Sequence, residues 1–267
     1  MSRLHDAFAR AKSENRAALI GYLPAGYPSV QGGIDAIVAM VANGVDIVEI
    51  GLPYSDPLMD GPTIQAAVDS SLRGGTTTRD VLATVKAVAE TGAPTLVMSY
   101  WNPIERYGVD AFAADLAAAG GVGVITPDLT AEEAGPWIAA TDAAGVDRVF
   151  LVAPSSTVER IAVVSGITTG FVYAASLMGV TGVASVSQAA PALVERTRPL
   201  TMMPIAVGLG VSTAAQAADI AVYADGVIVG SAFVRLLLDA ATPADGVAAV
   251  GRLAAELALG VRRASAG

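Results

Sequence analysis

The chain has 267 residues and a net charge of −9, and 53% of its residues are hydrophobic while only 15% are charged. This composition excludes wholesale disorder, and the negative charge opposes sequence-independent binding to nucleic acid, which needs a basic face. Because cysteine is absent, disulfides and thiolate metal sites are excluded, which fits a cytoplasmic protein. We expect neither a signal peptide nor a membrane span, since no run of about 18 apolar residues occurs.

Short β-branched runs alternate with alanine-rich helical segments along the chain. An amphipathic helix comes first, with Leu4, Ala7, Phe8 and Ala11 at helical spacing. The strands that the pattern predicts are residues 18–23, 46–50, 95–100, 123–126, 148–152, 170–174, 204–208 and 226–230. The helices predicted between and after them are residues 34–42, 63–72, 78–90, 111–119, 131–144, 187–197 and 213–222, with a further helical segment from Leu236 onward.

Eight strand–helix units without a linker predict a parallel sheet built from right-handed βαβ units. The length favours closure of this sheet into a single-domain (β/α)8 TIM barrel over residues 1–267. The extra N-terminal helix would plug the bottom of the barrel. An open, doubly wound sheet is the alternative that the pattern leaves.

The inventory of reactive side chains excludes several kinds of chemistry. His5, Lys12 and Lys86 all fall in predicted helices, whereas catalytic groups of this fold lie at the C-terminal ends of strands. A Schiff-base mechanism is therefore disfavoured, because it needs a lysine inside the barrel mouth. The sequence contains no G-x-S-x-G or H-E-x-x-H motif, so neither nucleophilic hydrolysis nor a metal site is supported. Carboxylates and phenols remain.

Two carboxylates are the best-placed acid–base groups. Glu49 lies near the end of an otherwise apolar strand, where an unpaired charge costs several kcal/mol, and Asp60 lies in the polar, turn-rich loop that follows. An apolar setting raises the pKa of a carboxyl group, which suits a general acid–base. The alternatives are a structural role for Glu49, bonded to backbone amides or a tyrosine, and turn or helix-cap roles for Asp56 and Asp60.

Glycine-rich loops follow the last three predicted strands. They are residues 178–182, residues 208–210, and Gly230-Ser231, the last of which opens a helix. Loops after strands seven and eight commonly hold a phosphate in this fold, and amide groups at a helix N-terminus bind anions. None of these loops contains lysine or arginine, so we expect the grip on a phosphate to be almost entirely main-chain.

The segment Val48 to Gln65, with the sequence VEIGLPYSDPLMDGPTIQ, resembles the signature of the tryptophan synthase α-subunit family, and the likeness extends to residues 21–28, residues 173–182 and Gly230-Ser231. The resemblance implies a TIM-barrel carbon–carbon lyase that cleaves indole-3-glycerol phosphate to indole and glyceraldehyde 3-phosphate. It also implies an α2β2 assembly in which a β subunit carries pyridoxal phosphate and makes tryptophan from the indole. No cofactor is then expected in this chain.

The resemblance also implies site residues. Glu49 and Asp60 would be the catalytic pair; strand placement suits Glu49 as the proton shuttle, and loop placement suits Asp60 as an ionised partner of the indole nitrogen. The substrate pocket would be lined by Tyr22, Tyr100, Leu129, Tyr173 and Leu209, and the phosphate would bind at Gly182, Gly210, Gly230 and Ser231. The residues expected to face the β subunit are Pro53, Asp56, Asn102 and Asp128.

The sequence departs from the common pattern of that family at a few positions. Leu177 stands where many members have arginine, and Tyr22 and Leu209 replace frequent phenylalanines. These changes indicate a repacked pocket rather than a different class of ligand. Two other functions stay open at this point: another phosphate-binding barrel enzyme, or a chain that works chiefly as an activating subunit.

Overall fold

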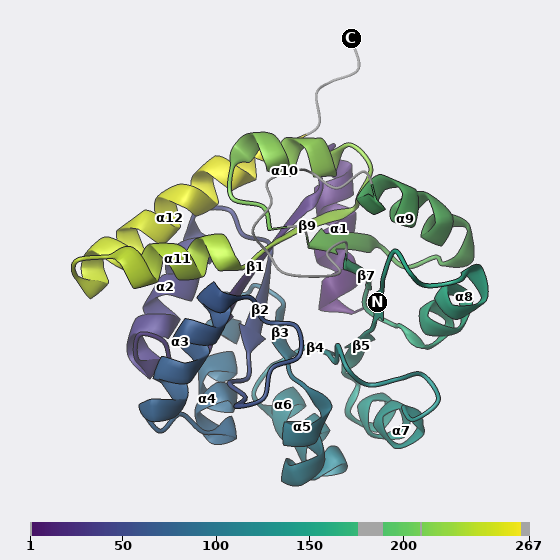
Figure 1. The fold of residues 1–267 in the computed structure, drawn as a ribbon, viewed down its shortest axis with the longest axis horizontal. Coiled ribbons are helices and arrows are strands. Elements are labelled where there is room, and N and C mark those ends of the chain that lie inside the picture. Colours follow the sequence, from purple (N-terminus) through teal and green to yellow (C-terminus); the bar gives the residue numbers. More distant parts are fainter. Residues whose placement is uncertain (1, 176–188, 209, 263–267) are drawn as a thin grey trace.

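Parallel strands in the middle of the molecule are surrounded by helices in the computed structural model, which describes residues 2–175, 189–208 and 210–262 (Figure 1). The strands are β1 (Ala18–Pro24), β2 (Ile47–Gly51), β3 (Thr95–Met98), β4 (Gly123–Ile125), β5 (Asp147–Val149), β6 (Leu151–Val152), β7 (Val172–Ala175), β8 (Ile205–Gly208) and β9 (Gly226–Val229). Their order in the sheet is β5-β4-β3-β2-β1-β9-β8-β7-β6. Since β5 and β6 flank Phe150 on one chain segment, the two ends of the sheet meet there, and the TIM-barrel prediction is confirmed.

The helices follow the strands much as the periodicity predicts. They are α1 (Arg3–Ser13), α2 (Val30–Ala42), α3 (Pro62–Arg73), α4 (Thr78–Ala89), α5 (Trp101–Tyr107), α6 (Val109–Ala118), α7 (Gly135–Ala144), α8 (Val158–Ile167), α9 (Ala189–Thr197), α10 (Ala214–Ala221), α11 (Ser231–Asp239) and α12 (Pro243–Gly260), with a 3-10 turn at Arg198–Leu200. Within these described parts, no helix is long and apolar enough to cross a membrane.

Three features differ from the sequence-based expectation. Helices α5 and α8 were not predicted, and the fifth predicted strand is interrupted at Phe150. The first turn of α5 contains Pro103, and its start is capped from a distance: both carboxylate oxygens of Asp128 accept the Trp101 amide N–H, at 2.9 and 3.2 Å. No local pattern reveals a cap that lies 27 residues further along the chain.

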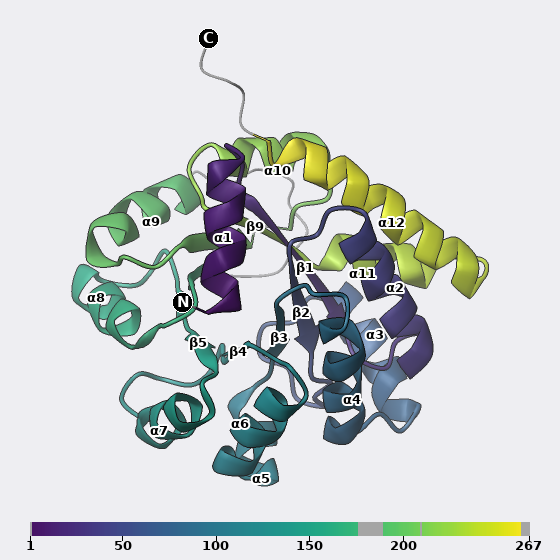
Figure 2. The same ribbon diagram turned by 180° about the vertical axis from the view of Figure 1, so that it is seen from behind.

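Helix α1 closes one end of the barrel, as the sequence predicts (Figure 2). Its apolar face, formed by Leu4, Ala7, Phe8 and Ala11, is buried. This face packs against a layer of inward-pointing side chains contributed by nearly every strand: Ala18, Ile20, Ile47, Leu96, Ile125, Val149, Ala206 and Ile228. The end of the barrel covered by α1 is therefore filled by apolar side chains, and we expect a reactive site at the opposite end.

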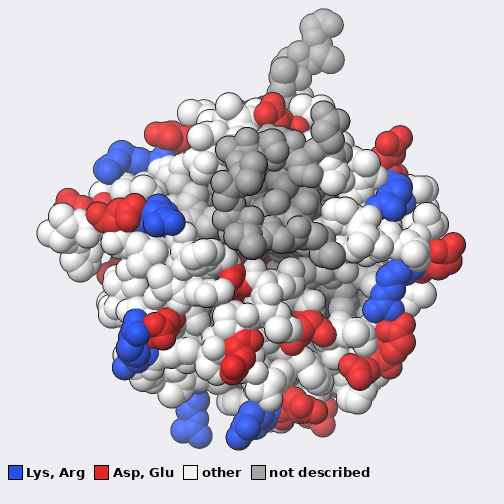
Figure 3. Space-filling model, in the orientation of Figure 1, with Lys and Arg blue, Asp and Glu red and all other residues white. Residues whose placement is uncertain are grey.

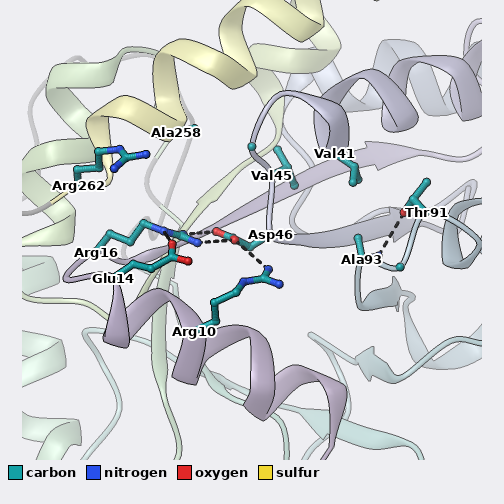
Figure 4. Close-up of a pocket in the computed structure, with 12 residues that line it drawn as sticks. Arg10, Glu14, Arg16, Val41, Val45, Asp46, Thr91, Ala93, Ala258 and Arg262 are labelled. Carbon is teal, nitrogen blue, oxygen red and sulfur yellow. Dashed lines mark hydrogen bonds and ion pairs between the residues drawn. The ribbon is translucent and has the colours of Figure 1, made fainter.

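A buried carboxylate holds α1 and the following segment against the start of β2. Asp46 accepts hydrogen bonds from Arg16 Nη1 and Nη2 at 2.5 and 2.8 Å, and from the Leu19 amide at 2.9 Å. Arg10 of α1 adds a longer contact of 3.3 Å, and Arg16 also bonds Glu14 (Figure 4). Only 6% of the Asp46 side chain is exposed, so this cluster is a part of the packed structure rather than a surface ion pair.

Candidate active site

A cavity of about 320 Å³ opens at the C-terminal ends of the strands, opposite α1. Its volume is that of a small-molecule site. The lining includes Tyr22 of β1, Glu49 of β2 and Tyr173 of β7, together with Asp60 and the loops after β8 and β9. Segments that are distant in sequence thus converge at one place, and both predicted catalytic carboxylates belong to it.

Glu49 is buried inside the barrel mouth. It pairs in register with Tyr22 of β1 and Leu96 of β3, and only 1% of its surface is exposed. Its Oε1 has no hydrogen-bond partner within the described part of the chain, which disfavours a purely structural role bonded to amides or a tyrosine. Burial raises the pKa of Glu49 to about 8. The carboxyl group is therefore mostly protonated at neutral pH, as a general acid requires.

Asp60 is only partly exposed, in the loop between β2 and α3. Burial raises the pKa of Asp60, while a hydrogen bond from the Tyr100 hydroxyl to Oδ1, at 3.2 Å, acts in the opposite direction. The same Tyr100 oxygen accepts the Met59 amide at 2.9 Å, and burial raises the pKa of Tyr100 to about 12. The surroundings of Asp60 are thus less polar than the loop sequence suggests, and Tyr100 fixes the loop and the carboxylate together.

Two inward tyrosines fill space that neighbouring glycines leave open. A Cβ atom on Gly51 would lie 2.2 Å from the Tyr22 hydroxyl, and one on Gly208 would lie 2.4 Å from the Tyr173 hydroxyl. Any larger residue at either glycine would displace a tyrosine from the cavity. Burial raises the pKa of Tyr22 and of Tyr173, so both hydroxyls stay protonated and can donate hydrogen bonds.

The predicted phosphate-binding glycines lie at one side of the cavity. Gly210, Gly230 and Ser231 all line it, and Gly230 is the N-cap of α11 without a side-chain hydrogen bond to that helix start. The first amide groups of α11 are therefore without a side-chain cap, as in an anion site. Gly182, Leu177 and Leu209 lie outside the described residues.

Sequence reasoning missed Arg235, which also lines the cavity. It lies on α11, four residues after Ser231, and therefore on the same face of the helix one turn further along. The signal for Arg235 in the sequence is its spacing of four residues from Ser231, which opens the helix.

The remaining predicted residues, and Tyr100 with them, do not belong to the lining of the cavity. Leu129 is buried in the loop after β4 and is not part of the lining, so its role in the pocket stays a prediction. Asp56 is exposed and accepts a hydrogen bond from the Ser55 hydroxyl, and Asn102 is exposed and donates to the Tyr54 hydroxyl. Pro53 is buried within this chain. Asp128, as the cap of α5, has a structural role whatever else it contacts.

Charged side chains of the described residues are unevenly distributed over the face that carries the cavity. In the space-filling view of this face, Lys and Arg side chains lie toward the outline, while some Asp and Glu side chains lie nearer the middle (Figure 3). Within the described residues, no group of three or more His, Cys, Asp or Glu side chains could hold a metal ion. The arrangement is suited to acid–base chemistry by a buried carboxyl group on a ligand that carries an anionic group at one end.

Comparison with known proteins agrees with the geometry. The family model described as "Tryptophan synthase alpha chain" matches residues 8–260. A tryptophan synthase alpha chain from Thermobifida fusca is 61% identical, covering 99% of this chain and all of the relative. A chain in a structure of Mycobacterium tuberculosis tryptophan synthase has a TM-score of 0.92 at 56% identity, covering 98% of this chain and 99% of that one. A Legionella pneumophila tryptophan synthase alpha chain has a TM-score of 0.89 at 30% identity, covering 98% and 97%. The chain belongs to the tryptophan synthase alpha chain family.

Proposed function

We propose that this chain catalyses the retro-aldol cleavage of indole-3-glycerol phosphate to indole and glyceraldehyde 3-phosphate, with Glu49 and Asp60 as the catalytic residues. The observation that carries the proposal is the state of Glu49: a carboxyl group buried at the base of the cavity, with one oxygen unpartnered in the described chain and a pKa of about 8. Family membership supplies the class of reaction.

Glu49 acts first as an acid and then as a base. The protonated carboxyl group delivers a proton to indole C3, which converts the ring to a leaving group. The resulting carboxylate then removes the proton from the C3′ hydroxyl while the C3–C3′ bond breaks and the C3′ carbonyl forms. One proton leaves the hydroxyl for each proton delivered to C3, so Glu49 ends protonated and ready for the next turnover.

Asp60 stabilises the positive charge that develops on the indole ring when C3 is protonated. As a carboxylate it accepts a hydrogen bond from the ring N–H, which strengthens as the charge grows. The Tyr100 hydroxyl, bonded to Asp60 Oδ1, orients the carboxylate for this contact. A group that binds the transition state more tightly than the substrate accelerates the chemical step.

The phosphate group of the substrate binds at the start of α11, where Gly230 and Ser231 lie beside Gly210. This contact holds the glycerol chain so that C3′ lies above Glu49, and such positioning contributes through orientation. Tyr22 and Tyr173 flank the reacting end of the cavity.

The proposed partner is a β subunit that carries pyridoxal phosphate and takes up the indole, in a cytoplasmic α2β2 assembly. Asp56 and Asn102, which the resemblance assigns to the partner interface, are exposed, and this exposure supports the proposed contact. The reaction of this chain itself needs no cofactor.

The decisive experiment incubates the purified chain with indole-3-glycerol phosphate, with and without a β subunit, and follows the release of indole. We expect Glu49→Gln to abolish indole release, because glutamine keeps the shape of the side chain but cannot transfer a proton. Its affinity for inorganic phosphate should stay within a few-fold of the unchanged chain, which serves as the control for folding. Retained turnover in this variant would refute the assigned mechanism.

A further inference from the structure

Arg235 is the one cation that lines the cavity among the residues described, whereas two carboxylates, Glu49 and Asp60, also line it. Because Glu49 is mostly protonated at neutral pH, the negative charge that a phosphate dianion meets at the reacting end is that of Asp60. The helix start at Gly230 and Ser231 offers partial positive charge, and Arg235 offers a full one. The position of Arg235 identifies the end of the cavity where an anionic group of a ligand is favoured.

The guanidinium group lies across the cavity rim. Arg235 Nη2 donates a hydrogen bond to Thr63 Oγ1 at 2.5 Å, which links α11 to the first turn of α3. The two helices lie side by side (Figure 1). Arg235 and Ser231 line the same cavity, and their spacing of four residues places them on one face of α11.

Arg235 makes few contacts within the part of the chain that the structure describes. Arginine has five N–H donors, and the bond to Thr63 is its single hydrogen bond within the described chain, with no ion pair. Arginine binds phosphate oxygens through paired N–H groups, and hydrogen bonds between charged groups are stronger than neutral ones. Such a charged donor beside a helix start without a side-chain cap is suited to an anion, and no described residue forms an ion pair with it.

We propose that Arg235 is the specificity-determining residue that makes this site select a phosphorylated substrate over its unphosphorylated counterpart. The proposal rests on the function proposed above and deepens it, since it assigns a side chain to a phosphate grip that otherwise consists of main-chain groups. Thr63 accepts one hydrogen bond from the guanidinium and leaves its charge available, so we assign Thr63 no role in selecting the phosphate.

The test compares Arg235→Gln with Thr63→Val in the full chain together with its β subunit. Each variant is measured with indole-3-glycerol phosphate, with indole-3-glycerol, and by calorimetry with inorganic phosphate. Glutamine removes the charge and keeps a donor for Thr63, whereas valine removes the acceptor and keeps the charge. Arg235→Lys is the conservative variant that restores the charge without the planar pair of donors.

For Arg235→Gln we expect about tenfold weaker phosphate binding and about a tenfold higher KM for the phosphorylated substrate, the lower end of the effect of a hydrogen bond between charged groups. The kcat value and the activity on indole-3-glycerol should change by less than twofold. Thr63→Val should leave phosphate affinity within threefold, and Arg235→Lys should recover part of the loss. Increasing salt should narrow the gap between the unchanged chain and Arg235→Gln.

Equal losses on the two substrates in Arg235→Gln would overturn the proposal, because that result indicates a link between α11 and α3 and nothing more. Unchanged phosphate affinity in that variant would also overturn it. Failure of the unchanged chain to cleave indole-3-glycerol phosphate would refute the proposed function instead. Phosphate calorimetry would still test Arg235 in that case, since it needs no turnover.

Discussion

Glu49 combines two properties that rarely occur together in one side chain: it is almost completely buried, and one of its oxygens has no partner in the described chain. An unbonded buried polar atom costs free energy of folding. Such a cost at the base of a cavity is consistent with a functional role, because a bound substrate can provide the missing partner. The high pKa of Glu49, about 8, follows from the same burial.

The pH dependence of kcat/KM follows from this pKa. Glu49 must be protonated to deliver a proton to C3, and the protonated fraction falls about tenfold for each pH unit above the pKa. As far as the protonation of Glu49 determines it, we expect kcat/KM for indole-3-glycerol phosphate to be constant up to about pH 8 and to fall above it. Steady-state rates between pH 6 and 10 check this, with circular dichroism as the control for folding. A rate that stays level to pH 10 would contradict the assignment.

The two ends of the site differ in how well the sequence reveals them. Glu49 can be identified because burying a carboxylate in an apolar strand costs free energy, and its apolar neighbours in the chain indicate that it is buried. Arg235 cannot, because an exposed arginine on a helix resembles any solvated residue until the position of α11 beside the cavity is known. The half-buried setting of Asp60 likewise depends on its contact with Tyr100, 40 residues away.

At the scale of elements, local pattern predicts the strands and the amphipathic helices well. Strands such as β1, β2 and β9 are buried along their whole length and are nearly continuous apolar runs bounded by turn residues. The failures have causes outside the local sequence. Helix α5 depends on Asp128 for its cap, and the division of the fifth strand at Phe150 depends on pairing with β4 on one side and β7 on the other. The secondary structure of these segments thus depends on contacts that form only when the barrel closes.

The loop between β2 and α3 carries two aspartates with separate predicted roles. Asp60 lines the cavity, whereas Asp56 is exposed, bonds Ser55 and does not line the cavity. We expect Asp56→Ala to leave cleavage by the isolated chain within about threefold, because Asp56 contacts no part of the cavity, and to reduce activation by the β subunit more strongly. Indole release measured with and without that subunit checks the expectation.

Glu49→Ala is the matched comparison for this variant, since it removes a carboxylate from the chemistry itself. A loss of isolated-chain cleavage in Asp56→Ala as severe as that in Glu49→Ala would show that the division of roles within the loop is wrong.

At the scale of the whole molecule, the barrel interior consists of two layers. Side chains such as Ile47 and Leu96 form an apolar layer with α1. Glu49, Tyr22 and Tyr173 form a second layer, which lines the active-site cavity. Asp46 adjoins the first layer from outside and ties the Arg10–Arg16 segment to β2. Asp46, which stabilises one end of the barrel, and Glu49, which lines the cavity at the other end, are thus only three residues apart in the chain.

Loss of the Asp46 carboxylate should destabilise the fold strongly. Asp46→Ala leaves Arg16, whose side chain is only 11% exposed, without its main partner, and breaking a buried pair in this way costs about 3–5 kcal/mol. The bond from Arg16 to Glu14 offsets part of that cost. Urea denaturation, comparing midpoints at an unchanged slope, measures the effect.

The matched control is Asp69→Ala, which breaks the exposed i,i+4 pair with Arg73 and should change the free energy of unfolding by less than about 0.5 kcal/mol. Similar losses in the two variants would mean that the Asp46 cluster contributes no more than a surface pair.

Among the described residues, the apolar layer covered by α1 closes one end of the barrel, and the active-site cavity opens at the other end. The closed end is filled by Leu4, Phe8 and the inward layer above them. The open end is therefore the route for substrate, for both products and for protons exchanged between Glu49 and solvent. A molecule bound at this opening can control both substrate entry and product release. A protein seated over the rim would set the order in which molecules arrive and depart, and would do so without touching either carboxylate.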